Sequence, residues 1–171
     1  MLKEIYFDRF DAKSWPNPSE LERYFLAPPA QRWTFETGND HWGLSVKGAE
    51  GTGHLEKNEG RIDVHLSMCG HRRHGVLLIY SRWDGVQNRF YNSKGDLSRL
   101  GELAFTLQDS PLPVGLFIPY DKAWGAVKEF METDGALPKS IEWIASRDLP
   151  PGTFPDPVEL RRRRLMSARK S

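Results

Sequence analysis

Apolar and polar residues alternate over much of the chain, and this two-residue period predicts β-strands. The clearest alternation runs from Arg61 to Met68, as expected for an antiparallel strand with one face in the core. Gly75 to Ser81 is instead a continuous apolar run, typical of a strand buried on both faces. The shorter strand candidates are Lys3 to Phe10, Trp33 to Phe35, Trp42 to Val46, His54 to Lys57, Asn88 to Asn92 and Leu103 to Leu107.

Two segments have the spacing of an amphipathic helix. Ser19 is a candidate N-cap for the first, which cannot extend past Pro28. The second is predicted over about Tyr120 to Glu132, with Pro119 at its start and Gly135 in the usual capping place after its end. The expected apolar faces are Leu21, Tyr24 and Phe25 in the first helix, and Ala123, Trp124, Val127, Phe130 and Met131 in the second.

The second helix is expected between two strands, Val114 to Ile118 before it and Ser140 to Ala145 after it. The resulting fold class is α+β, with a mainly antiparallel sheet, an N-terminal helix, and a C-terminal helix followed by a last strand. A chain of 171 residues has the length of one domain. We therefore expect a single domain over residues 1–158, followed by a basic tail over residues 159–171.

Composition indicates a folded protein of a reducing compartment. Hydrophobic residues make up 39% and charged residues 27% of the chain, which argues against intrinsic disorder. Cys69 is the sole cysteine, so no disulfide can form within the chain. The N-terminus lacks the apolar run of a secretory signal, and the longest apolar stretch, Val76 to Tyr80, is far below the roughly 20 residues of a membrane helix. The expected location is the cytoplasm, with no membrane partner.

The formal charge of +1 hides an uneven distribution. The last eleven residues contain six basic side chains and no acid, which leaves 18 basic against 23 acidic residues in residues 1–160, a formal charge of −5. An acidic body favours a basic protein partner. A terminal block of like charges is usually disordered, so we expect a disordered tail with at most weak affinity for nucleic acid. Its basic residues are Arg161, Arg162, Arg163, Arg164, Arg169 and Lys170.

The segment from Cys69 to Gly75 is the sharpest candidate for chemistry, because it holds Cys69, His71 and His74. A structural zinc site needs four ligands, usually in two separated pairs, and the chain has no second cysteine. The segment therefore reads better as a polar hairpin connection between two strands. The alternative function is a small cytoplasmic enzyme or ligand-binding domain that uses these three residues, with Cys69 as a nucleophile.

Other catalytic signatures are weak. The run Gly48 to Gly53 resembles a phosphate loop, but it lacks the Gly-Lys-Ser/Thr ending, and a hairpin turn explains it better. The sequence has neither a Gly-x-Ser-x-Gly elbow nor a His-Glu-x-x-His motif. We therefore assign no catalytic residue, no metal ligand and no cofactor.

The strand–helix–strand segment over residues 111–144 resembles the closing motif of the deaminase-type immunity proteins of bacterial polymorphic toxin systems. That family has an Ala-rich helix ending in Phe, a short break, a Pro, and a strand ending in Trp. The break between Thr133 and Pro138 is longer here than in the family pattern. The matching residues are Ala123, Ala126, Phe130, Thr133, Gly135, Pro138, Ile141 and Trp143. We expect Phe130 and Trp143 to lie in the core.

The resemblance implies a protein that binds one-to-one to a cognate toxin domain and covers its active site without doing chemistry. The toxins paired with this family are often nucleic-acid deaminases, which admit a base to a zinc-activated water. Loops carry binding residues more often than strands do, and Trp is enriched at binding hot spots. We therefore nominate an acidic contact surface with an aromatic anchor, formed by Trp83, Asp84, Glu50, Glu56 and Glu59.

Overall fold

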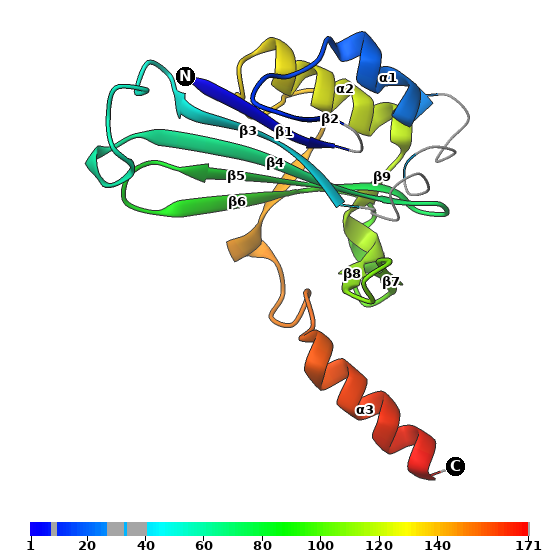
Figure 1. Ribbon diagram of the computed structural model, residues 1–171. Coiled ribbons are helices and arrows are strands. Elements are labelled where there is room, and N and C mark those ends of the chain that lie inside the picture. Colours follow the sequence, from blue (N-terminus) through cyan, green and yellow to red (C-terminus); the bar gives the residue numbers. More distant parts are fainter. Residues whose placement is uncertain (8–9, 27–32, 34–40, 171) are drawn as a thin grey trace.

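The computed structural model describes residues 1–7, 10–26, 33 and 41–170. It is an α+β fold with a mainly antiparallel sheet, as the sequence predicts (Figure 1). The strands are β1 (Leu2–Phe7), β2 (Phe10–Ala12), β3 (His41–Ala49), β4 (Ile62–His71), β5 (Gly75–Trp83), β6 (Asn88–Ser93), β7 (Leu103–Phe105), β8 (Pro111–Pro113), β9 (Phe117–Ile118) and β10 (Trp143–Ala145). The α-helices are α1 (Pro18–Leu26), α2 (Tyr120–Glu132) and α3 (Pro157–Lys170).

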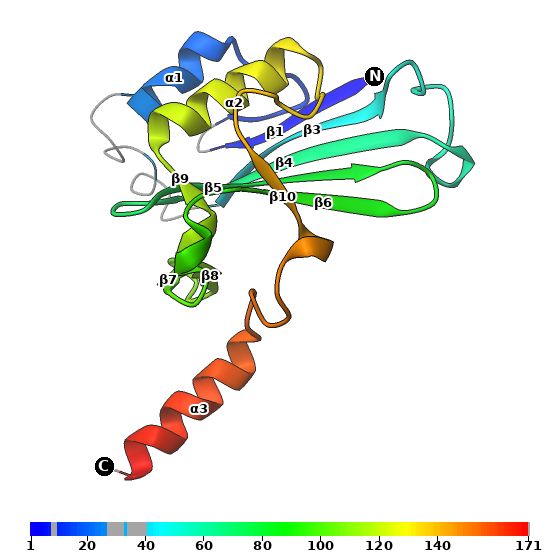
Figure 2. The ribbon, with the colours of Figure 1, turned by 180° about the vertical axis from the view of Figure 1, so that it is seen from behind.

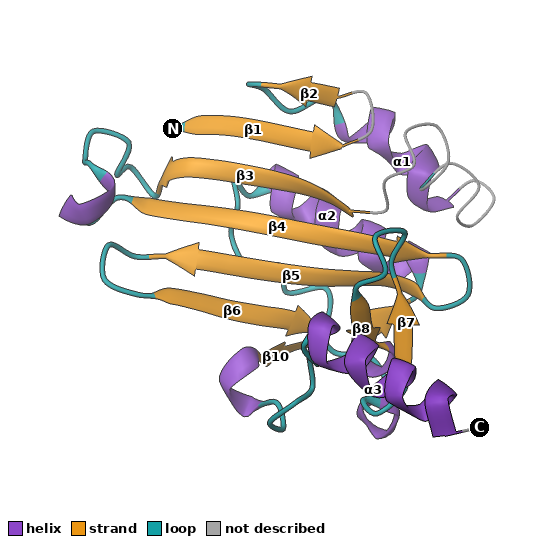
Figure 3. Cartoon of the chain, turned by 60° about the horizontal axis from the view of Figure 1, so that its bottom comes forward, coloured by secondary structure: helices purple, strands orange, loops and turns teal. Residues whose placement is uncertain are grey.

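The large sheet is a set of neighbouring antiparallel strands in the order β10-β6-β5-β4-β3-β1-β2, and β9 pairs with the start of β5. Strands β3 to β6 form its long central part (Figure 3). β7 and β8 form a separate two-stranded sheet below it. The last strand, β10, returns from α2 to the outer side of β6 and pairs only with the second half of that strand, Tyr91 to Ser93.

Helices α1 and α2 cover one face of the large sheet and enclose the main core (Figures 1 and 2). The alternating residues that the sequence assigns to the apolar face of β4 point into this core. Its centre is aromatic: Phe7, Trp33 and Trp42 pack against one another with ring centroids 4.1–5.7 Å apart. Burial of such large rings is the main source of the stability of this layer.

A second, smaller core lies on the opposite face, at the start of β5. Leu77 points away from the helices and packs with residues of the segment that carries β7, β8 and β9. Strand β5 is therefore buried on both faces, which explains its continuous apolar sequence. The other buried members of this cluster are Ala104, Val114, Leu116 and Phe117.

Three strand predictions differ from the structure. The predicted strand His54 to Lys57 is a turn followed by a short 3₁₀ helix, Lys57–Glu59, and the predicted strand Val114 to Ile118 is divided by the 3₁₀ turn Val114–Leu116. Lys3 to Phe10 divides into two strands, β1 and β2. Most of the predicted strand Trp33 to Phe35 lies outside the described residues. Helix α1 begins at Pro18, so Ser19 lies inside the helix and is not its cap.

In the segment behind the family resemblance, the helix folds as predicted, whereas the two flanking strands are shorter than predicted: β9 is Phe117–Ile118 and β10 is Trp143–Ala145. Helix α2 has the predicted bounds, and Gly135 ends it in the left-handed conformation (φ 93°) with its N–H donated to the carbonyl of Phe130. Phe130 is fully buried. Trp143 is only partly buried, because it lies on the outermost strand, and its Nε1–H donates to the carbonyl of Pro138 over 2.7 Å.

The sequence predicts a disordered tail over residues 159–171, and in the structure residues 157–170 form helix α3. The Asp156 carboxylate accepts hydrogen bonds from the N–H groups of Val158 and Glu159, and Glu159 pairs with Arg163 one turn later. The helix has no buried residue, and it projects from the body beside β7 and β8 (Figures 1 and 3). That the tail is dispensable for folding remains a prediction.

Candidate partner-binding surface

The face of the large sheet opposite the helices carries small and polar side chains over most of its area. Residues that pair directly across neighbouring antiparallel strands lie on the same face of the sheet. A row of five directly paired residues crosses the open face, with one residue on each of β1, β3, β4, β5 and β6. This open face contrasts with the apolar helix-covered face on the same strands. The row comprises Glu4, Ser45, His65, Ser81 and Phe90.

The five residues that the sequence nominates come together at one end of this sheet. Glu50, Glu56 and Glu59 lie in the connection between β3 and β4, while Trp83 and Asp84 lie where β5 turns into β6. The two connections touch so closely that a Cβ atom at position 85, where φ is 94°, would lie 2.5 Å from the Cα atom of Gly60. A glycine is therefore required at that contact.

Trp83 is held in place by the neighbouring connection. Its Nε1–H donates to the carbonyl of Lys57 over 2.9 Å, and the Lys57 ammonium lies 5.5 Å from the centre of its ring. The side chain remains partly exposed. It is thus a preorganised aromatic surface that fixes one loop against the next.

Most of the acids at this end are paired with arginines. Glu50 accepts two hydrogen bonds from Arg82, at 2.8 and 3.1 Å, and these hold the pKa of its carboxyl below the ordinary value. Arg61 forms a two-pronged pair with Asp63, at 2.9 Å for both bonds. Burial by itself would raise the pKa of Asp63, but the bonds from Arg61 and from the Gly48 N–H outweigh it and lower that pKa.

Asp84 shapes the turn between β5 and β6. One carboxylate oxygen accepts from the N–H groups of Val86 and Gln87, both at 3.0 Å, and these bonds lower the pKa of Asp84. The other oxygen lies 3.6 Å from Arg89. The nominated acids therefore divide into two groups. Glu50 and Asp84 are paired with arginines, whereas Glu56 and Glu59 are exposed and cap the 3₁₀ turn, where Glu59 accepts from the Glu56 N–H.

The structure adds two apolar residues that the sequence analysis missed. Phe90 is 45% exposed on the open face, diagonally across from Trp83, and Val86 is 86% exposed at the tip of the hairpin. Phe90 resembles any other alternating strand residue in the sequence. Its exposure became visible only once the strand register placed it on the open side of an outer strand.

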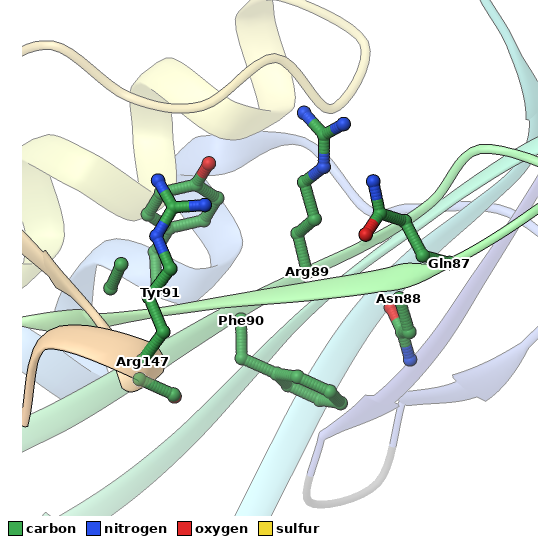
Figure 4. A pocket seen from close by; sticks show the side chains of 8 residues that line it. Gln87, Asn88, Arg89, Phe90, Tyr91 and Arg147 are labelled. Carbon is green, nitrogen blue, oxygen red and sulfur yellow. The ribbon is translucent and has the colours of Figure 1, made fainter.

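A cavity of about 300 Å³ lies beside the outer side of β6 (Figure 4). Arg89, Tyr91 and Arg147 point to one side of the strand, and Phe90 points to the other (Figure 4). Arg147 comes from the chain just beyond β10. With the Gln87 amide oxygen turned toward Arg89, that oxygen accepts from the guanidinium over 2.8 Å.

The Cys69–Gly75 segment joins β4 and β5 as the sequence predicts, but the connection is shorter than predicted: Cys69 to His71 continue β4, Gly75 begins β5, and only residues 72–74 lie between the strands. The rings of His71 and His74 stack with centroids 4.6 Å apart, and His71 Nδ1 accepts from the Arg73 N–H. Burial, with the charge of Arg99, lowers the pKa of His74. Cys69 is buried. Among the described residues, no group of three or more His, Cys, Asp or Glu side chains is placed to hold a metal ion.

Comparison with known proteins defines the class of this domain. Residues 16–145, most of the chain, match a family described as immunity protein Imm1. The chain therefore belongs to the Imm1 family of immunity proteins. This confirms the resemblance found in the sequence at the level of an immunity protein, and it makes a toxin protein the expected kind of partner.

A second similarity is limited in extent. The chain is 28% identical over 102 residues to ent-copalyl diphosphate synthase 2, chloroplastic, from Marrubium vulgare. The aligned part is 54% of this chain but only 13% of that protein, so it carries no argument about function. No solved structure matches the chain. No helix in the described part of the chain has the length and apolar character needed to cross a membrane.

Proposed function

We propose that this protein binds the catalytic domain of a cognate toxin, in a one-to-one complex in the bacterial cytoplasm, and inhibits it by covering its active site. The toxin is a nucleic-acid deaminase, as the sequence resemblance implies. The protein does this without catalysis of its own. The observation that carries the proposal is the family match over residues 16–145.

The contact surface is the end of the sheet where the β3–β4 connection meets the β5–β6 hairpin. Trp83 supports this choice, because an aromatic ring already fixed by a hydrogen bond loses little entropy on binding. Phe90 and Val86 extend the apolar part of the surface. Glu56 and Glu59 supply its exposed acids, while Glu50 and Asp84 shape it through their internal bonds.

Electrostatics favour fast encounter with a nucleic-acid enzyme. Such an enzyme presents a basic surface to its substrate, and residues 1–160 of this chain have a formal charge of −5. Opposite charges speed association and are screened by salt. Rising salt should therefore slow association much more than it speeds dissociation.

Co-expression tests the proposal directly. The protein is produced together with the toxin domain encoded beside it, and growth, complex formation and base deamination are measured. Survival, a one-to-one complex on size-exclusion chromatography, and loss of deamination are expected. Cell death without a complex would refute the immunity function. A toxin that is inhibited but acts by another chemistry would refute only the deaminase assignment.

The choice of surface has its own test. Glu56→Lys should slow association with the toxin domain by about tenfold, within the range over which steering acts. Glu22→Lys changes the net charge equally but lies on α1, on the other side of the sheet, and serves as the control. Equal effects of the two variants would show that overall charge matters, and that this end of the sheet does not.

A further inference from the structure

The outer side of β6 is only half covered. β10 pairs with Tyr91 to Ser93, and beyond Ala145 the chain turns away into a 3₁₀ turn. In the described part of the chain, no strand pairs with Asn88 to Phe90 on that side. An open strand edge is a template for pairing with another chain, which natural proteins usually cover.

The backbone of this open half faces outward at alternate residues. The Asp84 N–H donates to the Gln87 carbonyl, so these two residues form a hydrogen-bonded pair at the end of the β5–β6 ladder. Pairs alternate along an antiparallel ladder between bonded and non-bonded. Arg89 is therefore bonded to β5 opposite Arg82, whereas Asn88 and Phe90 direct their N–H and C=O groups away from β5.

The side chains beside this edge define what would fit it. On the helix side, the cavity holds Arg89 and Arg147, and on the open side Phe90 is exposed (Figure 4). Asp84 partly neutralises Arg89 at 3.6 Å. Arg147 has no ion pair or hydrogen bond with the described residues. The edge thus combines free backbone groups, positive charge on one side and an aromatic ring on the other.

We propose that an extended segment of the toxin domain adds to Asn88–Phe90 as a further strand. Its acidic side chain, opposite Arg89, faces the two arginines, and the adjacent apolar side chain packs on Phe90. Strand addition gives affinity through main-chain bonds and specificity through alternate side chains. The inference rests on the proposed function and names how that partner is held.

A second copy of this chain fits the edge poorly. Antiparallel pairing of two β6 edges around Asn88–Phe90 brings Arg89 directly opposite its own copy, and like charges in that position are destabilising. A strand of the toxin that carries an acidic residue opposite Arg89 instead places opposite charges side by side. The edge therefore favours a toxin segment over self-association.

Residue-resolved amide hydrogen exchange, measured by NMR on the free protein and on its complex with the toxin domain, tests the proposal. In the free protein the amides of Asn88 and Phe90 should exchange rapidly, whereas those of Arg89 and Tyr91, which bond to β5, should be protected. In the complex the first two should slow by about tenfold or more.

A charge variant sharpens the test. Arg147→Glu should raise the Kd for the toxin domain by about 30-fold or more, as expected when a like charge faces a desolvated acid. Lys122→Glu, an equal charge change on the exposed side of α2, should change the Kd by less than about threefold. Equal increases in Kd for the two variants would show that the cavity beside β6 does not contact the toxin segment.

The outcomes separate the two proposals. A tight inhibitory complex in which Asn88 and Phe90 exchange as fast as before would overturn strand addition and leave the immunity function standing. Absence of any complex or inhibition would overturn both. Protection of these amides in a free protein that sediments as a dimer would show that the edge belongs to a second copy, and would also overturn the proposal.

Discussion

The two faces of the large sheet are built from the same strands but have opposite tasks. On the helix-covered face, Phe130 and Tyr80 lie in a closed aromatic core, and the Tyr80 hydroxyl donates to the Gly135 carbonyl over 3.0 Å. On the open face, Trp83 and Phe90 remain accessible, and Asp63 beside Trp83 is fixed by its ion pair with Arg61. One face contributes most of the folding free energy, and the other carries the surface that we propose for the partner.

The difference lies in what each aromatic residue contacts. A ring enclosed on all sides contributes to the stability of the fold through burial of its apolar surface. A ring that is fixed only at its edge leaves one face accessible for contact with a partner. Rigidity at this end of the sheet comes from polar links between the β3–β4 connection and β5, such as the pair of Arg82 with Glu50 and the bond from Trp83 to Lys57.

The largest expected effect is on the closed face. Phe130→Ala should lower the free energy of unfolding by about 3–5 kcal/mol, because it empties a fully enclosed aromatic site. Phe90→Ala, the same substitution on the open face, should change it by less than about 1 kcal/mol. Chemical denaturation measures both. Similar losses of unfolding free energy in the two variants would contradict the distinction between the closed face and the open face.

The next effect concerns the end of α2. Gly135→Ala should destabilise the fold by about 1–3 kcal/mol, because the position has φ 93° and a Cβ atom there would lie 2.6 Å from Val64 Cγ2. Gly152→Ala is the matched control, since φ is 80° there but nothing lies within 4 Å of the added atom. Equal destabilisation in thermal unfolding would mean that backbone strain alone, and not the closed core, sets the cost.

A smaller loss of stability, which depends on pH, is expected when the Asp63 carboxylate at the open end of the sheet is removed. Asp63→Asn should cost about 1 kcal/mol at pH 7, since it weakens the bonds from Arg61 and the Gly48 N–H. The folded protein lowers the pKa of Asp63. The contribution of the Asp63 carboxylate to stability is therefore complete above about pH 4, near the pKa of an aspartate in the unfolded chain. It disappears as the pH falls through the lower pKa of Asp63 in the folded protein.

Denaturation of both proteins from pH 7 to pH 2 measures this difference. The gap between them should be constant down to about pH 4 and then close. Asp148→Asn, which also removes one carboxylate but at an exposed position, is the control and should change the free energy of unfolding at pH 7 by less than about 0.5 kcal/mol. A gap that widens toward low pH would contradict the assignment of the carboxylate to its two donors.

The smallest expected effect is removal of α3. Deletion of residues 157–171 should change the free energy of unfolding by less than about 0.5 kcal/mol, because the helix buries no residue and contacts the body through exposed pairs such as Arg161 with Asp109. Thermal unfolding of the shortened chain checks this. A large loss of stability would show that the helix belongs to the folded core.

Local signals explain what the sequence could predict. The bounds of α2 follow from Pro119, Gly135 and helical spacing, and the β4–β5 hairpin follows from alternation and an apolar run on either side of a polar turn. The strand predicted over Val114 to Ile118 failed because Gly115 is packed against the backbone of Asp96, a contact that no local pattern encodes. Helix α3 forms because the Asp156 cap, the Glu159–Arg163 pair and good helix propensity outweigh the repulsion between neighbouring arginines, on which the prediction of a disordered tail rests.

The site was less predictable than the fold. Trp83 and the four acids do gather at one end, but the pairing of Glu50 with Arg82, 32 positions apart, could not be read from the sequence. The cavity beside β6 depends on β10, whose Ala145 pairs with Tyr91 far earlier in the chain. Contacts between such distant segments are set by tertiary packing, so Phe90 and Arg147 emerged only from the structure.

The most direct test of the central claim compares two exposed aromatic residues at opposite edges of the same open face. Tyr6 on β1 is 56% exposed and Phe90 on β6 is 45% exposed. Isothermal titration with the toxin domain should show that Phe90→Ala raises the Kd about 30-fold, as for a hot-spot residue, while Tyr6→Ala changes it less than about threefold. The reverse order, or no change in either variant, would contradict the account.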